Sequence, residues 1–107
     1  MKKLIYFVAA FTALAAATAF GHAQGIGDPK EGLALSQQVC SRCHATVAAQ
    51  VKSPNSRAPR FPDLANTPGM SATALFVALT TPHAGMPMLT FTGEQRDDII
   101  SYFLSLH

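Results

Sequence analysis

The feature that most constrains this chain is the string Cys40-Ser41-Arg42-Cys43-His44, which contains its only two cysteines. Cysteines three positions apart on a helical turn lie on one face, with Cβ atoms about 5–6 Å apart. Two thiols at this spacing can each form a thioether with one of two neighbouring vinyl groups of a haem. The histidine that follows can turn its ring under the macrocycle and offer a nitrogen to the iron. The string therefore predicts one covalent haem c, attached through Cys40 and Cys43, with His44 as an axial ligand.

A Cys-x-x-Cys pair also occurs in thioredoxin-like redox sites, in zinc sites and in small structural disulfides. No strand–helix–strand pattern surrounds the pair in this chain, which disfavours a thioredoxin-like site. His83 and His107 lack the paired spacing that is typical of zinc ligands. A helix before the motif and an export signal before the helix favour haem over all three alternatives.

The first residues are typical of a secretory signal peptide. Met1-Lys2-Lys3 is a short positive segment, residues 4–20 carry no charge, and Gly21-His22-Ala23 places small residues at a cleavage site. We expect residues 1–23 to be removed and residues 24–107 to form one monohaem domain. A retained membrane anchor is the alternative, but the uncharged run is at the low end of the about 17–25 residues that span a bilayer. Haem of this type is attached outside the membrane, so we expect a periplasmic protein with no membrane insertion after cleavage.

The net charge of +2 includes Lys2 and Lys3. Without them, six basic residues balance six acidic ones, so the charge gives no reason to expect nucleic acid or anionic lipid as a partner. The remaining charges are unevenly placed, with basic residues in the middle of the chain and acidic residues near its end. Such a dipole can orient docking on a charged partner. An ordinary solvated surface would have the same composition.

Capping signals predict an all-α domain. Asp28, Ser71 and Thr92 each stand where a side chain can cap a helix, and Gln95 completes a capping-box pattern with Thr92. The predicted helices run over residues 29–40, 72–79 and 93–106. Four prolines between Ala45 and Gly69 predict a long loop with one helical turn at 62–65, and residues 81–91 form a second loop. The chain has no repeats and no alternating strand pattern.

The second axial ligand has several candidates. Thioethers are offered by Met70, Met86 and Met88, and imidazoles by His83 and His107. Met86 is favoured because Pro87 stiffens the backbone beside it and its loop is far enough along the chain to cross the opposite haem face. Met88 is the runner-up, and either methionine could instead line an apolar pocket. His83 is close enough in sequence to Met86 to exchange with it, although a surface histidine is the simpler interpretation.

Taken together, these motifs resemble the small class I c-type cytochromes, over nearly all of residues 28–106. The shared features are a glycine eight residues before the first cysteine, an Ala-Pro pair, a Met-Pro pair and a C-terminal helix with a tyrosine: Gly32, Ala58-Pro59, Met86-Pro87 and Ile99-Ile100-Ser101-Tyr102. The resemblance implies that the Pro59 carbonyl accepts the second N–H of the axial histidine and that Met86 supplies the distal sulfur. It also implies that the last helix crosses the first near Gly32. The family often has an aromatic residue where this chain has Ser36.

The resemblance implies a cytochrome c fold with three main helices and long haem-wrapping loops. It also implies a single-electron carrier, not an enzyme in its own right, that docks transiently on exported or membrane redox proteins. These partners are a dehydrogenase, a cytochrome complex or an oxidase. The expected walls of the haem pocket are Pro59, Phe61, Leu64, Phe76 and Phe91. The alternatives are a gas-binding sensor with an open distal site, the haem subunit of a dehydrogenase complex, and a small peroxidase that would use His83 and Arg96, a poor acid–base pair.

Overall fold

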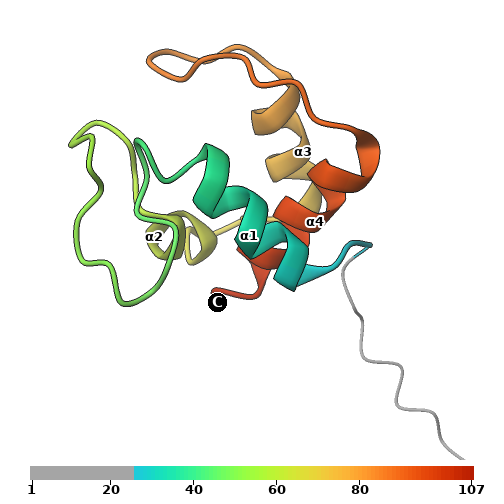
Figure 1. Cartoon of the computed structure of the whole chain (residues 1–107), viewed down its shortest axis with the longest axis horizontal. Coiled ribbons are helices and arrows are strands. Elements are labelled where there is room, and N and C mark those ends of the chain that lie inside the picture. The colour runs from blue at the N-terminus through green and yellow to red at the C-terminus, as the bar shows by residue number, and fades with distance from the viewer. Residues whose placement is uncertain (1–25) are drawn as a thin grey trace, which may run out of the picture.

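Four helices make up the regular structure of residues 26–107, which are the residues that this computed structural model describes (Figure 1). They are α1 (Pro29–Val39), α2 (Phe61–Ala65), α3 (Ala72–Thr80) and α4 (Gly93–Leu104). No strand occurs in this part of the chain, so the all-α prediction is confirmed. The signal peptide predicted at residues 1–23 lies outside the described residues.

The three predicted caps are all formed. The Asp28 side chain accepts a hydrogen bond from the Lys30 amide at 2.8 Å, with Pro29 in the first helical position. Ser71 caps α3 in the same way, and Thr92 exchanges hydrogen bonds with Gln95 in a complete capping box at the start of α4. These contacts satisfy amide groups that have no partner within their own helix. The helix starts are therefore fixed by local sequence.

Four helix boundaries differ by one or two residues from the predictions. Helix α1 ends one residue earlier than predicted, at Val39, and α3 ends one residue later, at Thr80. The last helix ends at Leu104 and does not continue to residue 106, because the Leu106 amide bonds back three residues to the Phe103 carbonyl in a tighter turn. The helical turn predicted at residues 62–65 begins one residue earlier, at Phe61.

Helix α4 is the centre of the fold and contacts each of the other three helices. It crosses α1 at Gly32, as the resemblance implied, where a Cβ atom would overlap the Asp98 carbonyl oxygen and lie 2.7 Å from the Tyr102 Cβ. Glycine is therefore required for the two helices to approach this closely. The buried core extends from this crossing along one side of α4 and consists of Cys40, Phe61, Ala65, Leu75, Ile100, Tyr102 and Phe103.

Two further contacts tie distant segments to α4. The Gly27 amide donates to the Ser101 hydroxyl at 2.9 Å, and the Asp28 amide donates to the Asp98 carboxylate at 2.7 Å. The Tyr102 hydroxyl donates to the carbonyl of Thr46, a residue that is almost fully buried. Helix α4 thus fixes both the start of α1 and the segment that follows its end.

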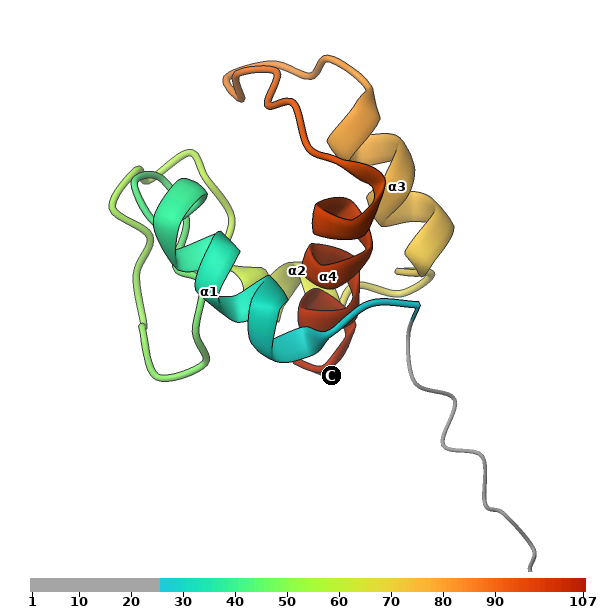
Figure 2. The same cartoon turned by 45° about the vertical axis from the view of Figure 1, so that its right-hand side comes forward.

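The two long loops start from different parts of this helical frame. The loop of residues 44–60, in green, lies beside α1, and the loop of residues 81–91, in orange, extends from α3 (Figure 2). In both views the orange loop reaches toward the C-terminal end of α1 (Figures 1 and 2). The segment predicted to carry the distal ligand therefore approaches the end of the helix that leads into the Cys-x-x-Cys-His motif.

Candidate haem site

The cysteine motif follows α1 directly, in a turn that continues the helix. The Cys40 amide still bonds to the Ser36 carbonyl at 2.8 Å, and both the Cys43 and His44 amides bond to the Cys40 carbonyl, at 3.1 and 2.9 Å. Cys40 and Cys43 are both free thiols, and they are not joined to each other. The motif therefore has the helical geometry that the thioether prediction assumed, with both sulfurs available.

The two thiols differ in their surroundings. Cys40 belongs to the buried core, whereas Cys43 is half-buried. Burial raises the pKa of the Cys40 thiol to about 11, and the neighbouring Ser36 hydroxyl offsets part of this rise. Burial is the larger of the two effects. At neutral pH Cys40 is therefore a neutral thiol, and its sulfur is well placed to face an apolar group.

His44 is held in one orientation by the loop. Its Nδ1 lies 2.7 Å from the Pro59 carbonyl oxygen, as the resemblance implied. A carbonyl oxygen can only accept, so Nδ1 carries the hydrogen and the lone pair of a neutral imidazole is on Nε2. The Phe61 ring packs against the imidazole with centroids 5.3 Å apart, and Phe103 supports Phe61 at 4.9 Å. His44 thus presents a metal-binding nitrogen whose direction is fixed by a backbone carbonyl and an aromatic ring.

Arg60 closes the loop that carries Pro59, a role that the sequence did not indicate. Its guanidinium donates to the carbonyls of Gln50 at 3.0 Å and Ala48 at 3.3 Å, and it pairs with Asp63 at 3.0 Å. Beside it, the Phe61 amide donates to the Ala45 carbonyl at 2.9 Å. No local pattern could have predicted these contacts, because the carbonyls belong to irregular backbone ten or more residues earlier.

The loop predicted to carry the distal ligand contains a single tight turn. The Met86 amide donates to the His83 carbonyl at 3.3 Å, and Gly85 has a φ of 80°. A glycine with positive φ at the third position is the signature of a type II turn. Met86 is the last residue of this turn and is half-buried, whereas Met88 is 55% exposed.

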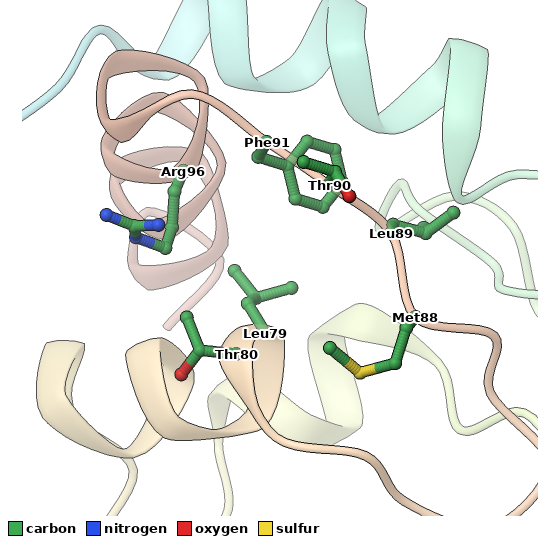
Figure 3. Close-up of a pocket in the computed structure, with 7 residues that line it drawn as sticks. All are labelled: Leu79, Thr80, Met88, Leu89, Thr90, Phe91 and Arg96. Atoms are coloured by element: carbon green, nitrogen blue, oxygen red, sulfur yellow. The ribbon is translucent and has the colours of Figure 1, made fainter.

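The predicted wall residues occupy different environments. Phe61 is buried in the core, and Leu64 packs on the edge of the core. Phe91 and Met88 line a cavity of about 240 Å³ between the end of α3, residues 88–91 and Arg96 (Figure 3). Phe76 is 44% exposed, and the Arg96 guanidinium lies 4.6 Å from the centroid of its ring. The structure therefore joins Cys40, His44, Pro59 and Phe61 in one connected group, whereas Met88 and Phe91 line a separate cavity.

Comparison with known families places the chain. The family model described as cytochrome c oxidase, cbb3-type, subunit III matches residues 27–103, which is most of the chain. The chain belongs to this c-type cytochrome family. Its cofactor is therefore a covalently bound c-type haem, and it is a haem-based electron-transfer protein. Comparison with the curated proteins and with the solved structures gave no significant match.

The residues of this cytochrome fit such a group. Two free thiols one helical turn apart suit two thioethers, and the neighbouring imidazole has its Nε2 free for iron. Within residues 26–107, no three His, Cys, Asp or Glu side chains cluster as metal ligands. In the same part of the chain, no helix is both long and apolar enough to cross a membrane.

Proposed function

We propose that this cytochrome carries single electrons on one haem, attached through Cys40 and Cys43 and ligated by His44 and Met86. The observation that carries the proposal is the 2.7 Å hydrogen bond from His44 Nδ1 to the Pro59 carbonyl. This bond leaves the lone pair of Nε2 free to bind iron. A hydrogen-bond acceptor for the ring nitrogen that does not bind the metal fixes the ring and raises the basicity of the ligating nitrogen. The histidine is thus ordered for its role by the chain itself.

The proximal side is built to change little during electron transfer. The His44 ring is fixed by Pro59 and Phe61, and the loop behind Pro59 is fixed by the guanidinium of Arg60. The bound haem iron supplies the redox chemistry, taking up and releasing one electron at a time. The protein contributes ligands that stay in place and apolar walls that disfavour the extra positive charge of the oxidised state.

Met86 is the better candidate for the distal ligand. Its half-buried side chain follows the turn at Gly85 with a proline immediately after it, whereas Met88 is largely exposed. A thioether opposite histidine raises the reduction potential and suits electron transfer. Met88 and Phe91 instead line the cavity beside the end of α3.

The partners follow from the family and from the charges. The matching family is described as an oxidase subunit, which favours an oxidase or another membrane redox complex as the partner. Exposed basic residues occupy the loop beside the cysteine motif, whereas Glu94 opens the acidic start of α4. This asymmetry supports transient docking with the basic loop toward an acidic partner. We also propose that residues 1–23 direct export to the periplasm and are then removed.

The decisive experiment is purification of the exported protein with its haem. A mass equal to that of the chain from Gln24 plus one haem, and a pyridine haemochrome spectrum of a haem with two thioethers, would support the proposal. Cys40→Ala and Cys43→Ala should each shift that spectrum toward a haem with one vinyl group remaining. A methionine–iron charge-transfer band in the ferric protein would support a methionine ligand, and its loss in Met86→Leu would assign the ligand to Met86. A colourless, folded protein at the bare chain mass would contradict the proposal.

A rapid reaction of the ferrous protein with carbon monoxide at neutral pH would instead indicate an open distal position. That result would favour the gas-binding alternative over the electron carrier. The same preparation serves both measurements, so the two functions can be compared directly.

A further inference from the structure

His83 and Met86 stand at the two ends of one turn. The Met86 amide donates to the His83 carbonyl, and the positive φ of Gly85 closes the chain between them. Side chains at the first and fourth positions of such a turn emerge next to each other. His83 Nε2 accordingly lies 3.0 Å from Met86 Sδ. Two side chains that can each ligate a metal, an imidazole and a thioether, are thus adjacent in this loop.

The contacts of the imidazole identify which nitrogen carries the hydrogen. His83 Nδ1 lies 3.1 Å from the Thr81 carbonyl oxygen, which can only accept. A carbonyl oxygen is also a much better acceptor than a thioether sulfur, so the hydrogen of the neutral ring belongs on Nδ1. Nε2 therefore directs a lone pair toward Met86. His44 shares the first of these features, because its Nδ1 also donates to a backbone carbonyl.

The surroundings allow either donor to be used. The imidazole of His83 is exposed, and within residues 26–107 it forms no ion pair. Within residues 82–91, the backbone forms one hydrogen bond to itself, and this bond closes the turn between His83 and Met86. The turn can therefore shift as a unit and present its other end without breaking further backbone contacts.

We propose that His83 is a second distal donor for the haem iron and takes the place of Met86 when the thioether is withdrawn. This inference rests on the proposed function, because it assumes that the loop of residues 81–91 faces the iron bound by His44. Imidazole in place of thioether lowers the reduction potential. The exchange therefore gives the cytochrome a second, lower-potential state without opening the iron to outside ligands.

The test compares Met86→Leu, His83→Ala and the double variant, each purified with its haem. Leucine keeps the apolar volume of methionine but cannot ligate iron. We expect M86L to lose the methionine–iron band, remain low-spin in ferric electron paramagnetic resonance and show a lowered midpoint potential. The double variant should become high-spin and bind carbon monoxide rapidly in the ferrous state. A high-spin M86L that binds carbon monoxide as fast as the double variant would overturn the inference.

A matched control separates His83 from the only other free histidine of the mature chain. M86L combined with His107→Ala should stay low-spin, and its conversion to high-spin would assign the second donor to His107 and overturn the inference. The haemochrome spectrum of each variant reports attachment, and Met86→Ala provides a second test if M86L fails to retain haem. A wild-type protein without a methionine–iron band that becomes high-spin in H83A would show that His83 is already the ligand in the wild type, which would overturn the inference of an exchange. Failure of all variants and of the wild type to hold haem would instead contradict the proposed function.

Discussion

Gly32 and Asp98 meet backbone to backbone where α1 crosses α4, so closely that a Cβ on Gly32 would overlap the Asp98 carbonyl oxygen. The crossing has a functional consequence, because α1 leads directly into the cysteine motif. Any displacement of α1 from α4 would move Cys40, whose side chain belongs to the core that α4 organises.

The first prediction tests this crossing. Gly32→Ala should lower the free energy of unfolding by about 1–3 kcal/mol, as overpacking does in a tightly packed core. Thermal unfolding of the haem-bound protein measures the loss. Gly93→Ala is a matched control, since a Cβ there meets only the Arg96 side chain, at 3.8 Å. Equal melting temperatures for G32A and the wild type would contradict the close approach.

The second prediction concerns the guanidinium of Arg60, which closes the loop of residues 44–60. Arg60→Ala should destabilise the protein by about 1–2 kcal/mol, because the carbonyls of Ala48 and Gln50 lose their donor. It should also broaden the ferric electron paramagnetic resonance signal, since the Pro59 carbonyl that orients His44 becomes less well fixed. Arg57→Ala removes an exposed charge of the same loop and should leave both measurements unchanged. If the two variants behave alike, the effect is one of charge alone.

The third prediction concerns the hydroxyl of Tyr102. Tyr102→Phe leaves the buried Thr46 carbonyl without its donor and should cost about 1–3 kcal/mol in urea denaturation. Tyr102→Leu, which also removes the ring, should cost more. A Y102F protein as stable as the wild type would show that the Thr46 carbonyl finds another donor.

The fourth prediction is a pH dependence with a definite sign. Burial raises the pKa of the Tyr102 phenol above its ordinary value of 10.0. The unfolded chain therefore releases this proton first, so the wild type loses stability as the pH rises from 10.0 toward the folded pKa. Below this window the contribution of Tyr102 is fully present.

Denaturation of wild type and Y102F at a series of pH values measures this effect. The difference in unfolding free energy between them should be constant below pH 10 and shrink above it. The haem-bound protein is the right sample, because the proposed thioether at Cys40 would remove the titration of that thiol. A difference that stays constant above that pH would place the phenol in ordinary solvent.

The sequence predicts what is decided locally. The helix starts follow from the caps at Asp28, Ser71 and Thr92, because each cap acts on amides within three residues. The end of α4 was placed two residues too late, since no glycine or proline marks the point where the last turn tightens.

The candidate site divides in the same way. The Cys-x-x-Cys-His geometry is local and could be predicted from spacing, and the contact between His44 and Pro59 came from the family resemblance and is present. The reach of Arg60 to Ala48 and Gln50 could not be predicted, because it depends on how an irregular loop closes. The places of Phe76 and Phe91 relative to the haem stay predictions, as does ligation by Met86.

The loops of residues 44–60 and 81–91 are held by different numbers of contacts, and this difference predicts the order in which they unfold. The loop behind His44 is fastened by Arg60 and by the Phe61 amide, whereas the loop of Met86 is closed mainly by its own turn. If Met86 and His44 ligate the haem iron as proposed, rising heat or denaturant should therefore release Met86 first and leave His44 bound. A partly unfolded molecule would then keep its covalently attached haem and its colour, but its reduction potential would already have changed.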